Sequence, residues 1–419
     1  MKMPKIRFKA NDNTDYPDWN DNNLGELGSF YGGLSGKSKE DFVGGNCRYI
    51  TYKNVYLNTF ATPCSNDLVK IKPSEHQNKV KKFDVLFTQS SETFEEVGLS
   101  SIYLYDDEPY LNSFCKGFRF RNLDHICPEF IGYQLRSNKV RHAIMLMGQG
   151  ISRINLRTEF LCKLTLSLPT LAEQHKIADL LLGVDAIIEK QQTEVATWEQ
   201  YKKGLAQKLF DQEVRFKADD GSDFPDWESK ILGELGSFYG GLSGKSKEDF
   251  VDGTCPYITY KNVYLNTFAT PISDDKVKIT PQERQNKVKQ FDILFTQSSE
   301  TFEEVGLSSV YLYDDEPYLN SFCKGFRFNN LEQIYPKFIG YLLRSDKVRH
   351  DIILMGQGIS RINLRTQYLS KLNFKLPSLA EQRKIAECLG AIDDVIALAK
   401  AELEKWRELK KGLLQQLFV

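Results

Sequence analysis

Leu168-Pro169-Thr170-Leu171-Ala172-Glu173-Gln174 opens a helical pattern that continues as far as Phe210. The same signal returns as Leu376-Pro377-Ser378-Leu379-Ala380-Glu381-Gln382, and the pattern after it runs to Phe418. In each stretch, a hydroxyl residue and the glutamate three positions later have the spacing of a capping box. The hydroxyl is expected to accept from a first-turn amide, and the carboxylate to return to the cap residue's own amide. Two long helices with defined starts are therefore predicted.

Beyond each cap, apolar residues recur at alternating steps of four and three, which is a heptad pattern. The two seams consist of Ile177, Leu181, Val184, Ile188, Val195, Trp198, Leu205 and Leu209, and of Ile385, Leu389, Ile392, Ile396, Ala399, Leu403, Trp406, Leu413 and Leu417. Lys202 and Lys410 are matching polar breaks, and Gln191 is a further break in the first copy. Such seams favour packing of one long helix against the other. Two core helices of separate domains remain the alternative.

The chain is an internal repeat with a constant offset of 208 positions, so that Phe210 corresponds to Phe418. From Leu24 to Thr158, 114 of 135 positions agree with the second copy, against 19 of 40 across the first helix. Loops normally drift faster than packing faces. The globular parts nevertheless agree better than the helices, which indicates that both globular parts are matched for one task. The predicted domains are 1–168 and 213–376, and the predicted helices occupy 169–212 and 377–419.

Composition and charge set broad limits on the class of protein. A length of 419 residues predicts two to four domains. The formal net charge of −1 excludes a polybasic tail but not a single basic face that binds nucleic acid. An apolar leader and a membrane-spanning run are absent from the sequence, so we expect a cytoplasmic protein without membrane contact. The eight cysteines form no C-x-x-C pair, which predicts reduced thiols and no structural metal.

Each globular part is expected to mix helices and strands. Tyr49–Tyr52, Asp84–Thr88 and Ser101–Tyr105 are short runs of β-branched and aromatic residues, which are typical of strands. A helix is predicted from Pro128 to near Arg141. A glycine-rich turn then precedes Ile151, and a short segment leads into the capping box. The predicted fold class is therefore α+β, with two near-identical mixed domains and two long helices packed as a coiled coil.

Two motifs resemble catalytic or nucleotide-binding sites, but neither is complete. Gly32–Ser38 is similar to a P-loop, yet Tyr31 stands where the first glycine is required. Asp107–Tyr110 resembles the D-P-P-Y site of amino-methyltransferases, yet Glu108 replaces the first proline and a glycine-rich cofactor loop is missing. The five histidines have no metal-ligand spacing. The sequence therefore predicts a chain without catalytic residues, metal or cofactor of its own.

Polar runs in presumed loops recur unchanged in the second copy. Gln, Asn and Arg can make bidentate contacts to base edges, whereas Lys and Ser suit phosphates. We expect base-edge contacts from Gln89, Arg153, Asn155, Gln297, Arg361 and Asn363, phosphate contacts from Lys37, Lys53, Lys245 and Lys261, and further DNA contacts from Ser90, Ser91, Gln149, Ser298, Ser299 and Gln357. For any single residue of this set, a solvated loop position is the alternative.

The order of these parts resembles the specificity subunit of a type I restriction-modification enzyme. The resemblance covers the whole chain and is carried by the doubled L-P-x-L-A-E-Q-x-K-I-A motif and by Tyr16-Pro17-Asp18-Trp19, which returns as Phe224-Pro225-Asp226-Trp227. It implies two target recognition domains and an antiparallel helical spacer, so we expect the two helices to form an antiparallel coiled coil with pseudo-two-fold symmetry. It also implies double-stranded DNA, two modification (methyltransferase) subunits and, in the nuclease form, two restriction subunits as partners. S-adenosylmethionine would be bound by the modification subunits, and ATP and Mg by the restriction subunits.

We therefore expect a non-catalytic subunit that recognises a bipartite DNA target. Family members usually carry two dissimilar recognition domains, whereas the two domains of this chain nearly coincide, which predicts an inverted-repeat target. A protein-interaction scaffold without sequence-specific DNA binding is one alternative, and an autonomous adenine methyltransferase is another. Methyl transfer by the chain alone would distinguish the enzyme. Absence of specific DNA binding, even with the modification subunit present, would distinguish the scaffold.

Overall fold

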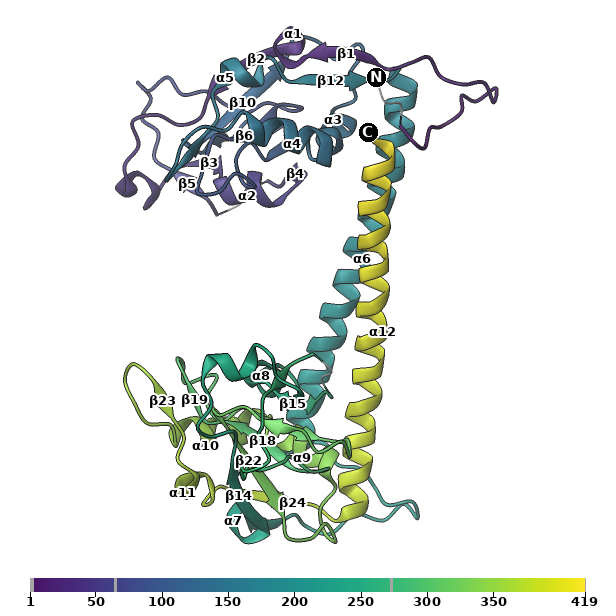
Figure 1. The fold of residues 1–419 in the computed structure, drawn as a ribbon. Helices are drawn as coiled ribbons and strands as arrows, with labels where there is room; N and C mark the ends of the chain where they lie inside the picture. Colours follow the sequence, from purple (N-terminus) through teal and green to yellow (C-terminus); the bar gives the residue numbers. More distant parts are fainter. Residues whose placement is uncertain (1–3, 64–65, 272–273, 419) are drawn as a thin grey trace. The chain divides into compact units, whose positions relative to one another are not determined.

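The computed structural model describes residues 4–63, 66–271 and 274–418. It divides into two compact units. The first comprises Met1–Thr193 together with Lys400–Val419, and the second comprises Glu194–Ala399. Each unit therefore contains one globular copy, the beginning of the helix that follows that copy, and the end of the other long helix (Figure 1).

The first globular copy is built on a five-stranded sheet with strand order β2-β10-β6-β8-β4. Its elements are β1 (Asn20–Asn23), α1 (Leu24–Leu27), β2 (Gly28–Gly32), a 3-10 helix (Lys39–Phe42), β3 (Cys47–Ile50), α2 (Tyr52–Leu57), β4 (Phe60–Ala61), β5 (Leu68–Val69), β6 (Val85–Thr88), β7 (Ser90–Ser91), β8 (Ser100–Tyr103), β9 (Tyr110–Leu111), β10 (Cys115–Phe120), α3 (Pro128–Leu135), α4 (Asn138–Leu146), β11 (Ile154–Asn155), α5 (Thr158–Leu161) and β12 (Thr165–Leu168). All pairings within this sheet are antiparallel except that of β4 with β8.

Two faces of this sheet are buried, which explains its near-continuous apolar runs. Phe87 and Phe118 lie in the main core together with Phe130 and Ile131 of α3. Leu86 and Tyr103 lie in a second core with Ile50 and other residues of the smaller sheet β5-β3-β9. The α+β class predicted from sequence is confirmed.

The second globular copy repeats this arrangement, with sheets β14-β22-β18-β20-β16 and β17-β15-β21. Its elements are β13 (Glu228–Ile231), α7 (Leu232–Leu235), β14 (Gly236–Gly240), a 3-10 helix (Lys247–Phe250), β15 (Cys255–Ile258), α8 (Tyr260–Leu265), β16 (Phe268–Ala269), β17 (Lys276–Val277), β18 (Ile293–Thr296), β19 (Ser298–Ser299), β20 (Ser308–Tyr311), β21 (Tyr318–Leu319), β22 (Cys323–Phe328), α9 (Pro336–Leu342), α10 (Asp346–Leu354), β23 (Ile362–Asn363), α11 (Thr366–Leu369) and β24 (Asn373–Leu376). The predicted repeat is therefore structural as well as sequential.

Some predicted element boundaries were wrong. The helix expected from Pro128 to near Arg141 is two helices, because the chain breaks at Arg136 and Ser137 between α3 and α4. The strand expected at Tyr49–Tyr52 ends at Ile50, since Thr51 caps α2 by accepting from Asn54 N. β-propensity alone could not reveal that cap. The seven cysteines within the described ranges are free, and Cys64 lies outside those ranges.

A two-stranded ladder joins each globular copy to its long helix. β1 pairs antiparallel with β12, so that Asn20 lies opposite Leu168 and Asn23 opposite Thr165. β12 then runs through Pro169 into α6 (Leu171–Phe210) (Figure 1). β13 and β24 make the same ladder before α12 (Leu379–Leu417). The helix start is thereby held by strand pairing on its own domain.

The helix-opening motif has a different internal chemistry from the one its capping-box spacing predicts. The buried carboxylate of Glu173 accepts from Arg7 Nε at 3.0 Å and Nη2 at 2.8 Å. Glu381 accepts from Arg215 with the same distances. The predicted return of each carboxylate to its cap amide is therefore wrong, because an arginine 166 positions earlier offers a bidentate partner. The hydroxyl half of the box is present in the second copy, where Glu381 N donates to Ser378 Oγ at 3.4 Å.

The glutamine of the motif is buried and links the start of the long helix to the globular domain. Gln174 is fully buried, and its Oε1 accepts from Cys127 N at 2.9 Å. Its Nε2 donates to the carbonyl oxygens of His125 and Pro169, both at 2.9 Å. Gln382 has the corresponding partners in the second copy. A buried amide with its partners satisfied fixes direction as well as distance, so α3 and the start of α6 are locked together.

The seams of α6 and α12 are buried or half-buried along their whole length. In the first unit, Ile177 and Leu181 near the start of α6 share a core cluster with Leu417 at the end of α12. In the second unit, Ile385 near the start of α12 shares a cluster with Leu209 at the end of α6. The start of each helix therefore packs beside the end of the other. The predicted antiparallel coiled coil is confirmed.

Candidate nucleic-acid interface

The predicted DNA-contacting runs of each copy meet at one edge of the globular domain. β7 pairs with β11, so that Ser90 lies opposite Asn155 although 65 positions separate them in sequence. The amide of Leu156 donates to the carbonyl of Gln89 at 2.9 Å. β19 and β23 form the same pair in the second copy (Figure 1). Folding therefore unites two sequence runs into one polar edge.

The segment from Gln149 to Asn155 is a tight hairpin, which we call the reading hairpin; Gln357–Asn363 is its second copy. Gln149 N donates to Asn155 O at 2.9 Å, and Asn155 N donates to Gln149 O at 2.8 Å. Gly150 has a φ of +136°, and a Cβ there would lie 2.0 Å from the carbonyl oxygen of Arg153. Only glycine fits this turn. The hairpin is anchored by Ile154, which is buried.

Ile151 forms the tip of the reading hairpin and is fully exposed, as is Ile359 in the second copy. An exposed single apolar residue needs no explanation by itself. Here, however, it projects from a turn of fixed geometry beside arginine and amide side chains. Sequence reasoning gave Ile151 no role, although its presence in both copies was a usable signal.

Arg153 lies on the exposed ring of Phe114, with the guanidinium carbon 5.2 Å from the ring centroid. Arg361 lies 4.9 Å from the centroid of Phe322 in the same way. The carbonyl of Phe114 accepts from Gln89 N at 2.8 Å, which ties the ring to the polar edge. Stacking on an aromatic face orients a guanidinium and leaves its in-plane donors free. Phe114 and Phe322 are further site residues that sequence reasoning missed.

The serines of the polar edge divide into two kinds. Ser90 and Ser298 are half-buried, whereas Ser91 and Ser299 are buried. Ser91 Oγ is hydrogen-bonded to the Tyr52 hydroxyl, and Ser299 Oγ donates to Thr301 O at 2.6 Å. The second serine of each pair thus faces the domain interior, because side chains alternate along a strand.

Lys53 and Lys261 are exposed on the first turns of α2 and α8. Tyr52, the neighbour of Lys53, contacts Ser91, so α2 adjoins the polar edge. The structure therefore places an accessible cation close to the predicted base-reading residues.

Lys37 and Lys245 do not have the accessible ammonium that a phosphate contact requires. The side chain of Lys37 is 4% exposed, pairs with Glu75 and donates to Lys70 O at 2.7 Å. Lys245 pairs with Glu283 at 2.5 Å and donates to Lys278 O at 2.6 Å. In this structure both lysines pin the glycine loop to the domain. The spacing of the loop motif could not reveal a carboxylate 38 residues away.

Two arginines, the half-buried Arg136 and the buried Arg141, hold loops next to the polar edge. Arg136 Nη2 donates to the carbonyl oxygens of Val55, Tyr56 and Asn58 at 2.8–2.9 Å. Arg141 Nη2 donates to the carbonyls of Glu95 and Val97, at 3.0 and 2.8 Å. Burial lowers the pKa of both guanidinium groups to about 10. Both therefore stay charged at neutral pH and hold these carbonyls as cations.

Asp107, Glu108 and Pro109 of the D-E-P-Y segment lie in the connection between β8 and β9, and Tyr110 begins β9. Asp107 accepts from the Tyr103 hydroxyl and pairs with Arg48 at 3.2 Å. The carboxylate is thereby committed to holding the turn.

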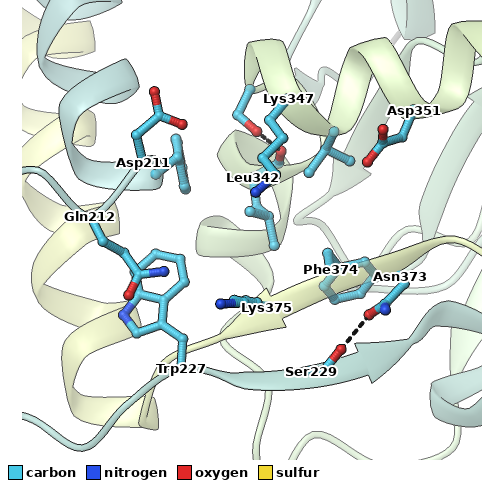
Figure 2. A pocket seen from close by; sticks show the side chains of 13 residues that line it. Asp211, Gln212, Trp227, Ser229, Leu342, Lys347, Asp351, Asn373, Phe374 and Lys375 are labelled. Carbon is cyan, nitrogen blue, oxygen red and sulfur yellow. Dashed lines mark hydrogen bonds between the residues drawn. The ribbon is translucent and has the colours of Figure 1, made fainter.

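A cavity of about 270 Å³ lies in the second unit, beside the junction between α6 and the second globular copy (Figure 2). Asp211, Trp227 and Lys347 line it. Ser229 Oγ donates to Asn373 Oδ1 at 2.6 Å, so this hydroxyl faces an amide and not a general base (Figure 2).

Among the described residues, no group of three or more His, Cys, Asp or Glu side chains could hold a metal ion. Within the same ranges, no helix is long and apolar enough to cross a membrane.

Two globular domains, each with a polar reading edge and each opening an antiparallel helix, define the architecture of a DNA specificity subunit. The family model for the type I restriction modification DNA specificity domain matches residues 16–197 and 225–405. The chain belongs to this family.

Two curated relatives match this chain in sequence over more than two thirds of its length. The MjaVIII specificity subunit of Methanocaldococcus jannaschii is 25% identical over 69% of this chain and 68% of its own length. The putative MjaX specificity subunit of the same organism is 25% identical over 80% of this chain and 77% of its own.

Among solved structures, the S subunit of a type I restriction-modification system from M. genitalium matches with a TM-score of 0.53 and 17% identity. That match covers 100% of this chain and 99% of the other. A second solved structure, described as showing complex assembly and conformational transition of the type I restriction-modification system, matches with a TM-score of 0.56 and 17% identity. This match covers 96% of the present chain and 98% of the other chain. At this identity the two structures support the fold.

Proposed function

We propose that this chain is the non-catalytic DNA-recognition subunit of a type I restriction-modification enzyme, and that each globular copy reads one half of a bipartite target. The observation that carries the proposal is the doubled polar edge. In both copies Gln, Asn and Arg side chains surround a rigid hairpin, with a lysine close by. Side chains of this kind read base edges when such a hairpin enters the major groove.

The proposed contact set is narrower than the one expected from sequence. Base-edge contacts are assigned to Gln89, Gln149, Arg153 and Asn155, with Gln297, Gln357, Arg361 and Asn363 in the second copy. Ser90, Ser298, Lys53 and Lys261 are assigned to phosphates, because hydroxyl and ammonium groups suit phosphate oxygens. Lys37, Lys245, Ser91 and Ser299 are left out, since their polar groups are engaged within the domain.

The helices offer a surface for the modification subunits. A second row, which flanks the seam on each helix, carries exposed or half-buried apolar residues. In the first unit the row consists of Leu180, Ile187 and Leu409; in the second it consists of Cys388, Val395 and Tyr201. Leu180 and Ile187 lie seven residues apart on one helix, as do Cys388 and Val395 on the other, and apolar residues at this spacing can pack against a further helix. We propose one such patch per unit, each taking one modification subunit.

In this proposal 1–168 and 213–376 are the recognition domains, and 169–212 and 377–419 form the spacer. The chain itself holds no cofactor. S-adenosylmethionine belongs to the modification subunits, and ATP and Mg to restriction subunits where these join the complex. The assembly acts on cytoplasmic DNA.

The test is reconstitution with the modification subunit. Purified chain alone should transfer no methyl group, whereas the complex should bind and methylate one bipartite sequence. Methyl transfer by the chain alone would instead establish the enzyme. Normal assembly without sequence-specific DNA binding would establish a protein scaffold.

A further inference from the structure

Each recognition domain is tied to both long helices through one polar triad. In the first unit, the hydroxyl of Tyr133 on α3 donates to Asp185 Oδ2 on α6 at 2.7 Å. Lys410 Nζ on α12 lies 2.5 Å from the other carboxylate oxygen. The same ammonium lies 5.5 Å from the centroid of the Tyr133 ring. Three elements therefore meet through three side chains.

The second unit repeats this triad with the roles of the helices exchanged. Tyr341 on α9 donates to Asp393 Oδ2 on α12 at 2.7 Å. Lys202 on α6 lies 2.6 Å from Asp393 Oδ1 and 5.0 Å from the Tyr341 ring centroid. The agreement is notable because the helices differ at more than half of their positions.

The lysines of these triads are the shared polar breaks in the two heptad seams. A polar residue within a coiled-coil seam weakens the apolar contact but selects one register and one orientation. The lysine side chains are 22–24% exposed, and those of the aspartates 29–37%. Ion pairs with this much solvent contribute little net stability. A role in geometry accounts for them better than a role in stability.

The other side-chain contacts between this domain and the end of α12 are largely apolar. Phe130 packs on Phe418 at 5.3 Å between centroids, and Leu413 and Leu414 pack against the same core. Apolar contacts are non-directional and allow a domain to settle at several angles. Hydrogen bonds to a charged group depend strongly on direction. Gln174 already joins α3 to the start of α6, so the triad is suited to fixing the angle of the domain against the second helix, α12.

We propose that Tyr133, Asp185 and Lys410, with Tyr341, Asp393 and Lys202, are positioning residues that fix each recognition domain on the spacer and so restrict the enzyme to one spacer length. This inference rests on the proposed function. It assigns base reading to the hairpins and spacing accuracy to the triads, which are different residues.

The test uses the complete complex and a plasmid library in which fixed half-sites are separated by every gap near the natural one. The variant carries Lys202→Met and Lys410→Met. Methionine keeps an unbranched aliphatic side chain of similar length and removes the positive charge. Methylation at gaps one base pair too long or too short should rise about tenfold relative to the natural gap. Base preference within the half-sites should stay unchanged.

Two matched variants separate positioning from general damage. Lys202→Arg with Lys410→Arg keeps the charge and should restore the narrow gap preference. Lys203→Met with Lys411→Met changes the neighbouring exposed lysines and should behave as wild type. Circular-dichroism melting identifies any variant that fails to fold, and Tyr133→Phe with Tyr341→Phe then provides a milder probe of the same triads.

A Met variant that folds and keeps the wild-type gap preference would overturn the inference. Broadened gaps accompanied by altered half-site bases would also overturn it, because the effect would then be a general loss of recognition. If the wild-type complex itself methylated no bipartite site, the proposed function would fail first.

Discussion

Arg153 is the residue on which base reading by the first domain should depend most. Its guanidinium is held on Phe114, so its donors can approach a base in a fixed orientation. Replacing Arg153 with Ala should cost about 1–3 kcal/mol of binding and relax base preference at one half-site. Binding selections with the complex would measure both effects. Unchanged specificity would remove Arg153 from the contact set. Arg361→Ala is the matched variant for the other half-site.

Lys37 and Lys53 should behave differently although both are lysines of the same domain. Lys53→Ala should weaken binding evenly across sequences and lower the slope of log K against log salt by about 1. Lys37→Met should leave that slope unchanged and lower the free energy of unfolding of the domain, because Glu75 and the carbonyl of Lys70 lose their donor. Salt titrations and urea unfolding distinguish the two. A reduced salt slope for Lys37→Met would restore it as a phosphate contact.

At the scale of single residues, the sequence showed which side chains are polar. It did not show which of them are accessible and which are hydrogen-bonded within the domain. The recurring Gln, Asn and Arg runs were identified from the sequence, but their meeting at one edge depends on strand pairing that only the structure shows. The partner of Lys37 lies 38 residues away, and the burial of Ser91 depends on strand alternation and on Tyr52. Phe114 and Ile151 were missed because apolar residues in loops are usually incidental.

Among the elements, the start of α6 is the joint that should respond most sharply to one substitution. Gln174 is fully buried and makes three hydrogen bonds to the backbone. Gln174→Leu leaves the Cys127 amide unsatisfied and should lower the unfolding free energy by about 2–3 kcal/mol. Gln192→Leu, at an exposed position of the same helix, is the control. Equal losses of unfolding free energy for both substitutions would show that the hydrogen bonds of Gln174 do not stabilise the joint.

The two long helices should also act as a ruler for the DNA target. Removing one heptad from both, Ile188–Glu194 and Ile396–Glu402, keeps each seam in phase and shortens the pair by about 10 Å. The recognised gap should shrink by about 3 base pairs, with both half-sites unchanged. Methylation mapping reports the gap directly. An unchanged gap would mean that the helices do not set the spacing.

Helices and seams were predictable because a heptad signal is long and survives substitution. The smaller elements were less so. The break between α3 and α4 depends on Arg136, whose side chain reaches back to the end of α2. The capping glutamate pairs with Arg7, which no local spacing indicates. Long-range side-chain partners decided the details in both places.

Across the whole molecule, the most distinctive property is that one recognition domain is present twice. The antiparallel pairing of α6 and α12 gives each domain the same combination of one helix start and one helix end. We propose that two like units of this kind are related by a two-fold, because a two-fold would satisfy both seams most simply. A protein two-fold aligned with a DNA dyad presents the same side chains to opposite strands. We therefore predict an inverted-repeat target.

The two copies still differ at some exposed positions. His76 corresponds to Arg284, and Arg121 to Asn329. Neither pair lies on the reading hairpin, so we expect these differences to tune affinity at one half and to leave its base sequence unchanged.

Methylome sequencing of DNA exposed to the reconstituted complex tests the central claim most directly. The predicted result is a short half-site, a non-specific gap and the reverse complement of the same half-site, with one methylated adenine in each half on opposite strands. Recovery of two unrelated half-sites would contradict the claim that both domains read the same bases.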